Sequence, residues 1–259
     1  MNIHEFGKDN KKVILLIHPS LVKWDYFEYI LPLLEQDYHL IVPALPGYDF
    51  DENSDFTSVE EIADDLIEWL TDHNINHLFA VYGCSMGGSI ALLTALRTQV
   101  IIDHCVIDGG ITPYRLPWMI TRLIALKDYL MMMLGRAGGT KLLEKVFSTD
   151  EYSKEDLEYV SEVLQHCSRK TLWRTFDSCN NYKLPDPLPK INTKIHYWFA
   201  ENEQKARKAD IRYMKDFFPD TVFDRYPDLG HAGLVLLKPE LFTEKIKQLD
   251  ADIFIEVKR

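Results

Sequence analysis

Cysteine is scarce in this chain and is never arranged as a metal site. Four cysteines are spread over 259 residues without a CxxC pair. This spacing excludes the usual thiolate metal centres and favours isolated, buried thiols. We therefore expect no metal and no cofactor, and a reducing compartment such as the cytoplasm. The four residues are Cys84, Cys105, Cys167 and Cys179.

Long apolar runs and an apolar leader segment are also missing. No uninterrupted apolar stretch approaches the ~20 residues that are needed to cross a bilayer. Residues 1–12 are polar and charged, which excludes a signal peptide of the usual form. The sequence therefore predicts no membrane span.

Basic residues are outnumbered by acidic ones in this chain. The chain has 29 Lys and Arg against 40 Asp and Glu, which gives a formal net charge of −11. Because nucleic acids and anionic membranes are bound through clustered Lys and Arg, neither is an expected partner. The one dense basic cluster, Lys205, Arg207 and Lys208, lies among acidic residues and is interpreted as a solvated helix face. A small-molecule substrate is the expected partner, and the oligomeric state is left open.

The chain alternates short apolar runs with helical patterns. Residues 13–17 are apolar at every position, which is typical of a central strand covered on both faces. The alternation predicts an α/β fold, with a mostly parallel sheet and helices on both of its faces. The predicted strands are 13–17, 38–42, 77–82, 100–107, 194–199 and 221–226, and the predicted helices are 26–34, 57–72, 89–96, 205–218 and 238–249.

Strand patterns are absent from residues 112–189, which are helical and rich in bulky apolar side chains. We expect a core domain of residues 1–111 and 190–259, with 112–189 as a helical cap over the carboxyl edge of the sheet, where ligands bind in open α/β folds. Tyr114 and Trp118 are candidates for the wall of a substrate pocket. The run Met131, Met132 and Met133 suits an adaptable apolar wall, or else packing of the cap onto the core.

The strongest local motif is Gly83-Cys84-Ser85-Met86-Gly87, directly between a predicted strand and a predicted helix. This is the G-x-S-x-G pattern of a nucleophile elbow in its required context. A strand that reverses into a helix so sharply strains the backbone at the serine, and the glycines prevent collisions. Ser85 is therefore the candidate nucleophile.

A serine hydroxyl needs a base to take its proton, and His231 is the candidate among nine histidines. It lies in the short loop Gly230-His231-Ala232-Gly233, after the last predicted strand and before a final helix. The chain order of nucleophile, acid and histidine is that of the α/β-hydrolases. The other histidines lie within or beside predicted strands and helices.

Three segments together resemble the α/β-hydrolase superfamily: His18-Pro19-Ser20, Gly83 to Gly88, and Leu229 to Gly233. The resemblance covers nearly the whole chain apart from the insertion, and it implies the α/β-hydrolase fold with a Ser-His-acid triad. In this family a His-Gly pair opens the oxyanion loop, whereas here Pro19 replaces the glycine and has no N–H to donate. The implied oxyanion donors are the backbone N–H of Met86 and that of Ser20 or Leu21, with His18 positioning the loop.

The resemblance also implies an acid in the loop after strand 194–199. Where relatives carry Gly-x-x-Asp, this chain has Ala200-Glu201-Asn202-Glu203, so Glu203 occupies the matching position. A glutamate is able to orient the imidazole and stabilise its cation. Asp108, at the end of the preceding strand, is the second candidate because some relatives place the acid there, and Glu201 is the third. An exposed helix-terminal charge is the alternative interpretation of Glu203.

The expected function is hydrolysis of a carboxylic ester or thioester of a small molecule through an acyl-enzyme. Two alternatives stay open. The same fold and triad also serve C–C bond hydrolysis, lyase and acyl-transfer chemistry, because fold does not fix function. A non-catalytic ligand-binding member is the second alternative, and Pro19 and the uncertain acid are the features in its favour.

Overall fold

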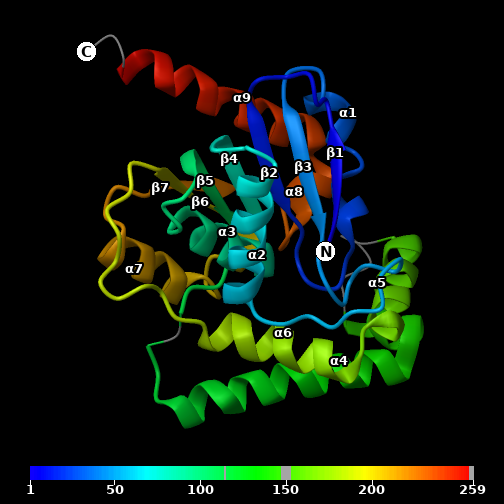
Figure 1. Cartoon of the computed structure of the whole chain (residues 1–259). Helices are drawn as coiled ribbons and strands as arrows, with labels where there is room; N and C mark the ends of the chain where they lie inside the picture. Colours follow the sequence, from blue (N-terminus) through cyan, green and yellow to red (C-terminus); the bar gives the residue numbers. More distant parts are fainter. Residues whose placement is uncertain (114, 147–152, 257–259) are drawn as a thin grey trace.

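A seven-stranded sheet forms the centre of the computed structural model, which describes residues 1–113, 115–146 and 153–256 (Figure 1). The strand order is β1-β3-β2-β4-β5-β6-β7, and all neighbours are parallel except β1 and β3. The mostly parallel α/β class predicted from the sequence is confirmed. The strands are β1 (Asn2–Phe6), β2 (Val13–Ile17), β3 (His39–Ala44), β4 (His77–Cys84), β5 (Ile101–Asp108), β6 (Lys194–Ala200) and β7 (Val222–Tyr226).

The central position of β2 in the sheet explains why the sequence of this strand is apolar throughout. Val13, Leu15 and Ile17 pack in one core cluster with helices α2 (Val59–Asp72) and α3 (Met86–Ala95). Ile14 and Leu16 belong to the cluster on the opposite face. That face is covered by η1 (Trp24–Phe27), α1 (Leu31–Leu34), α8 (Gly233–Leu237) and α9 (Pro239–Glu256). Both faces of the strand are therefore buried, as a parallel sheet requires.

Strand β1 was not predicted. Its residues pair antiparallel with β3 at the edge of the sheet, from Asn2 opposite Ala44 to Phe6 opposite Leu40. Only one neighbour and little burial are available at an edge, so backbone pairing suffices and no apolar run is needed. The polar start of the chain consequently hid the strand.

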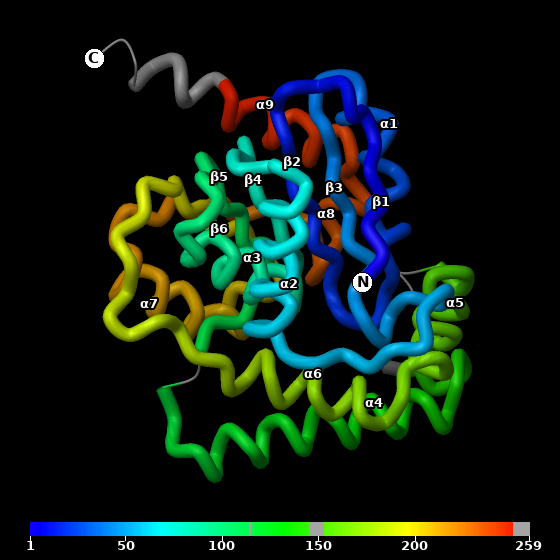
Figure 2. Tube along the Cα trace, in the orientation of Figure 1, coloured from blue at the N-terminus to red at the C-terminus, as the bar shows by residue number. Residues whose placement is uncertain are grey.

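Among the described residues, three helices lie between β5 and β6: α4 (Trp118–Val146), α5 (Lys154–His166) and α6 (Arg169–Asn181). Figures 1 and 2 show α6 running along the carboxyl edge of the sheet, with α4 outside it. Helix α6 is fixed to the core by buried threonines: the Thr171 hydroxyl accepts a bond from the Phe56 N–H at 3.1 Å, and the hydroxyls of Thr175 and Tyr48 are 2.8 Å apart. Helix α4 is interrupted at Gly139, where φ is 58° and ψ is −160°.

The apolar side chains of α4 divide between core and solvent. Met132 and Met133 pack against the main core cluster, whereas Met131 is about half exposed. Met119 is 70% exposed and Leu123 is 63% exposed. Packing onto the core therefore explains only part of the apolar composition of this segment.

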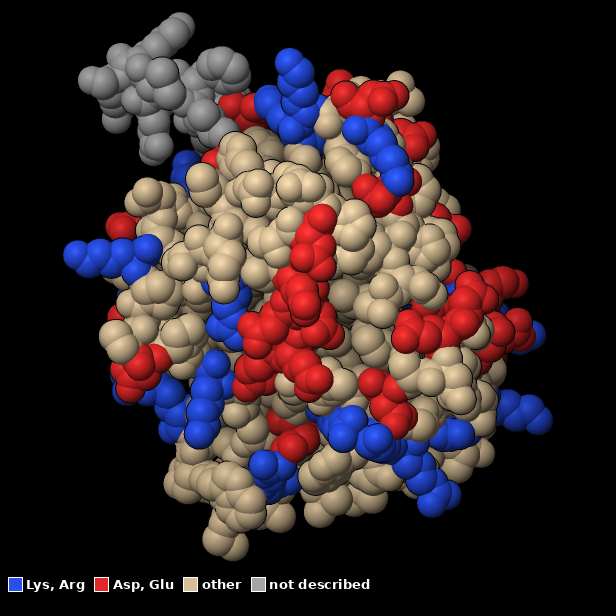
Figure 3. Space-filling model, viewed as in Figure 1, with Lys and Arg blue, Asp and Glu red and all other residues tan. Residues whose placement is uncertain are grey.

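The surface matches the charge balance of the sequence. Figure 3 shows acidic side chains in a stripe over α2, whose acidic residues are Glu60, Glu61, Asp64, Asp65, Glu68 and Asp72. In the described ranges, no helix combines the length and the apolar character that crossing a bilayer demands. All four cysteines are buried free thiols, as their spacing predicted.

Candidate active site

Ser85 lies at a sharp turn between β4, which ends at Cys84, and α3, which begins at Met86. Its φ of 52° and ψ of −115° are strained for a residue with a side chain. Glycine is required beside it, because a Cβ at Gly83 would collide with the carbonyl of Gly87 and a Cβ at Gly87 with the carbonyl of Ile17. The G-x-S-x-G motif thus forms the elbow that its sequence predicted.

His231 lies in the loop between β7 and α8, and its ring is oriented by a carboxylate. Its Nδ1 is 2.7 Å from Oε2 of Glu203, the last residue of η2 (Glu201–Glu203). Glu203 is 8% exposed and His231 is 37% exposed. An ionised carboxylate only accepts, so Nδ1–H is the donor and Nε2 carries the lone pair of the neutral ring. This tautomer is the one that a general base needs.

Two further donors hold the Glu203 carboxylate. The backbone N–H of Ala200 donates to Oε1 at 3.1 Å, and Nε of Arg207 donates to Oε2 at 3.0 Å. Burial works to raise the pKa of Glu203, but the hydrogen bond and charge of His231, with the charge of Arg207, outweigh it and lower this pKa to about 2. Glu203 is therefore a fixed anion at neutral pH rather than an exposed helix-terminal charge.

Arg207 corrects the expectation of a solvated basic face. Lys205 and Lys208 are exposed, but the Arg207 side chain is only 16% exposed and lies between two carboxylates. Its NH1 lies 3.4 Å from Oδ2 of Asp210, which is 4% exposed. The spacing of three and four residues along one turn and helix brings these charges together, which is the signal that the sequence offered.

The other candidate acids have different partners. Asp108 accepts a hydrogen bond of 2.7 Å from the hydroxyl of Tyr82, and burial raises its pKa to about 6. Glu201 forms an ion pair of 3.2 Å with Arg225 at the surface. Glu203 is the one of the three that hydrogen-bonds His231 Nδ1.

The segment after β2 is held by His18. This side chain is fully buried, and burial lowers its pKa to about 4, so the ring is neutral. Its Nδ1–H donates to the carbonyl of Pro19 at 2.8 Å, and its Nε2 accepts from the N–H of Leu45 at 3.3 Å. Leu21 follows with a left-handed φ of 68°. Met86 is the first residue of α3, so its N–H has no acceptor within that helix.

A groove of about 880 Å³ lies between α4, the end of α6 with the residues that follow it, and α7 (Lys208–Phe217). The pocket candidate Trp118 lines it together with Arg122, Tyr182 and Tyr213. Tyr182 donates to the carbonyl of Ile111, which also accepts from Ser89, one turn after Ser85 in α3. The other pocket candidate, Tyr114, lies outside the described residues.

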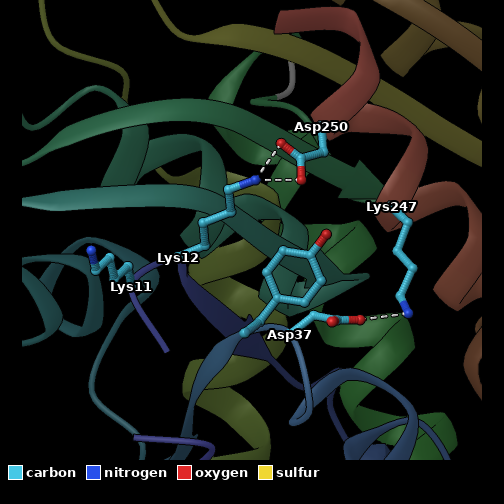
Figure 4. A pocket seen from close by; sticks show the side chains of 6 residues that line it. Lys11, Lys12, Asp37, Lys247 and Asp250 are labelled. Atoms are coloured by element: carbon cyan, nitrogen blue, oxygen red, sulfur yellow. Dashed lines mark hydrogen bonds and ion pairs between the residues drawn. The ribbon is translucent and has the colours of Figure 1, made fainter. Parts of the chain in front are cut away.

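A second hollow, of about 420 Å³, lies at the opposite edge of the sheet, where the strands begin (Figure 4). Lys12 pairs with Asp250 there, and Lys247 pairs with Asp37 at 2.7 Å. These two ion pairs involve four of the charged side chains that line the hollow. Over the part of the chain that the structure describes, no group of three or more His, Cys, Asp or Glu is arranged to hold a metal ion.

Comparison with known proteins assigns the chain to a family. Residues 14–245 match the model of the alpha/beta hydrolase family. An uncharacterized hydrolase of Saccharomyces cerevisiae is 29% identical over 105 residues, a match that spans 39% of this chain and only 36% of the yeast protein.

Solved structures agree over almost the full length. An alpha/beta hydrolase family protein from Desulfitobacterium hafniense superposes with a TM-score of 0.76 at 21% identity, covering 96% of this chain and 99% of that one. MenH from S. aureus gives 0.77 at 18% identity, covering 97% of both chains. An esterase from Exiguobacterium antarcticum gives 0.74 at 18% identity, covering 96% of this chain and 94% of that one. The chain belongs to the alpha/beta hydrolase family.

Proposed function

We propose that the protein is a serine hydrolase that cleaves a carboxylic ester or thioester of a small molecule through an acyl-enzyme. The hydrogen bond between His231 Nδ1 and Glu203 Oε2 carries the proposal, since a buried carboxylate that fixes the tautomer of a loop histidine is the arrangement of a catalytic base. The strained turn at Ser85 supports it from the nucleophile's side. The esterase among the structural neighbours agrees in fold.

In the proposed acylation, Ser85 Oγ attacks the carbonyl carbon while His231 Nε2 takes the hydroxyl proton. Glu203 stays ionised and stabilises the imidazolium that forms. The N–H of Met86 and that of Ser20 or Leu21 donate hydrogen bonds to the tetrahedral oxygen and stabilise its negative charge. Each such donor typically contributes about 3–4 kcal/mol to the transition state. The imidazolium then gives its proton to the departing alcohol or thiol, and the acyl group stays on Ser85.

In the proposed deacylation, water takes the place of the leaving group. His231 removes a proton from the water, the resulting hydroxide attacks the acyl carbon, and the proton returns to Ser85 Oγ. The acid product leaves and the enzyme is regenerated. No metal or cofactor takes part in either half of this cycle. We assign the groove that Trp118 lines to the part of the substrate that does not react.

We also propose a cytoplasmic location, because the four cysteines are buried free thiols and a reducing compartment keeps thiols in this state.

Labelling with a fluorophosphonate probe tests the proposal. We expect the purified, folded protein to label at Ser85, and the Ser85→Ala variant to remain unlabelled. Ser89→Ala is the matched control, because Ser89 lies in the helix that follows Ser85 but its hydroxyl donates to the carbonyl of Ile111. Absence of labelling in the folded wild-type protein contradicts the proposal. A panel of esters, thioesters and C–C substrates with product analysis then separates hydrolysis from the other reactions of this triad.

A further inference from the structure

A chain of buried polar contacts leads away from the candidate acid. Glu203 Oε2 accepts from Arg207 Nε at 3.0 Å, and Arg207 NH1 lies 3.4 Å from Asp210 Oδ2. The other oxygen of Asp210, Oδ1, accepts both the N–H and the hydroxyl of Thr112, at 2.8 and 2.9 Å. Thr112 is 3% exposed.

Thr112 occupies a particular place in the fold. It follows β5 by four residues and stands at the start of the segment that leads to the cap helices. The residues just before it are also fixed: Gly109 N–H donates to the carbonyl of Trp198 at 2.8 Å, and the Tyr197 hydroxyl donates to the carbonyl of Gly110 at 2.7 Å. The root of the cap is thus tied to β6 and α7, the same two elements that flank Glu203 along the chain.

Building on the serine-hydrolase function proposed above, we propose that Arg207 and Asp210 form a positioning pair, which holds Glu203 against His231 and fixes that arrangement to Thr112 at the root of the cap. The pair solves a problem created by the glutamate, whose side chain has one more rotatable bond than an aspartate. Two donors, Ala200 N–H on one oxygen and Arg207 on the other, remove that freedom.

The positive charge of Arg207 is a second reason, besides geometry, why the site needs this residue. Burial works to lower the pKa of Arg207, but Tyr197, Glu203 and Asp210 raise it overall, so the guanidinium is always charged. The charge of Glu203 also acts on two buried groups of the neighbouring strands, because it works to raise the pKa of Asp108 in β5 and that of Cys84 in β4. Without Arg207, three carboxyl groups would share this buried region with only His231 to balance them.

Removing the positive charge at position 207 and the negative charge at position 210, in separate variants, tests the pair. When kcat/KM is plotted against pH, the acidic limb of the profile reports the protonation of the proposed base, His231. Arg207→Met removes a cation, so we expect the midpoint of this limb to move up by about 0.5–1 pH unit, whereas Asp210→Asn removes an anion and should move it down by a similar amount. Asparagine keeps an oxygen that accepts from Thr112, so we expect the fold to be preserved. The double variant should return the midpoint toward the wild-type value.

Arg207→Lys is the conservative variant, and it separates charge from geometry. It keeps the cation, so the midpoint should stay within about 0.3 pH unit of wild type, while kcat should fall roughly 3–10-fold because lysine lacks the planar fork. A loss of activity in all variants with an unchanged midpoint would mean that Arg207 only stabilises the fold, and it would overturn the proposal.

The link to the cap root is tested by coupling. Thr112→Val removes one bond to Asp210 and keeps the side chain's shape, and we expect it to lower kcat roughly 2–5-fold in the wild-type background. In the Arg207→Met background it should have no further effect, because the contact no longer reaches Glu203. Additive effects would overturn this part. Fluorophosphonate labelling of the wild type reports separately on the proposed function, so its failure is distinguishable from failure of the pair.

Discussion

The backbone N–H of Ser85 donates a hydrogen bond of 2.8 Å to the carbonyl oxygen of Asp108. This bond holds the turn at Ser85 against the end of β5, directly before Gly109. A Cβ built on Gly109 would lie 3.0 Å from Nδ1 and Cε1 of His231 and 2.9 Å from Oε1 of Glu203. The segment Asp108-Gly109 therefore bonds the turn that presents the hydroxyl and leaves no room for a side chain beside the imidazole that is expected to activate it. The proposed proton transfer depends on this shared support.

Gly109→Ala should impair activity by crowding that support. The new methyl group would press on both His231 and Glu203, and the φ of +57° at this position disfavours any side chain. We expect kcat/KM to fall roughly 10–100-fold, because small displacements of positioned groups are costly in catalysis. Steady-state kinetics on a substrate that the wild type turns over measures the effect.

Gly135→Ala is the matched control for this experiment. Gly135 is a buried glycine of α4, but a Cβ there would make ordinary contact with Leu143 and Leu164, at 3.4 and 3.6 Å. Its activity should equal that of the wild type. Equal activity of both variants and the wild type would show that the space beside His231 is not critical.

Glu203→Gln and Asp108→Asn distinguish the two leading candidate acids. A glutamine at 203 cannot stabilise the imidazolium and presents a donor or a neutral acceptor to Nδ1, so kcat should fall about 10³–10⁴-fold. Asp108 contacts the hydroxyl of Tyr82, and its asparagine variant should stay within about 5-fold of wild type. If the two losses were reversed, the acid assignment would move to Asp108.

The sequence predicted those parts of the molecule that depend on local pattern. Apolar runs marked the buried strands β2 to β6, and the glycines beside Ser85 marked the elbow, because no other residue fits where backbones touch. Glu203 was found by matching a loop pattern to relatives, and the structure brings it to His231. In each case the signal lies within a few consecutive residues.

Features set by contacts distant in sequence were missed. The sequence places Arg207 in a solvated basic cluster with Lys205 and Lys208. The fold instead shows that it pairs with Asp210 and Glu203. Asp210 in turn meets Thr112, 98 residues away. The exposed face of α4 was equally hidden, since composition shows that a segment is apolar but not which side is covered.

Asp108→Asn should also change how stability depends on pH. Burial raises the folded pKa of Asp108 from 3.8 to about 6, so the folded protein binds this proton more tightly than the unfolded chain. Between these values the free energy of unfolding falls as pH rises, because ionising the buried group is costly. The variant lacks this cost. We subtract the free energy of unfolding of the wild type from that of the variant, and we expect this difference to be about 2 kcal/mol larger at pH 8 than at pH 4.5. Urea unfolding at both pH values measures the difference, and an identical difference at the two would contradict it.

Two leucines of the helices between β5 and β6 distinguish a buried position from an exposed one. Leu172 of α6 is fully buried in the main core cluster, so Leu172→Ala should leave a cavity and lower the free energy of unfolding by about 2–5 kcal/mol. Leu123 of α4 is largely exposed, and Leu123→Ala should change it by no more than about 0.5 kcal/mol. Denaturant unfolding of both variants, at one protein concentration, makes the comparison. A large loss for Leu123→Ala would show that this face is covered in solution, whereas a small loss for Leu172→Ala would show that α6 contributes little to the folding of the core.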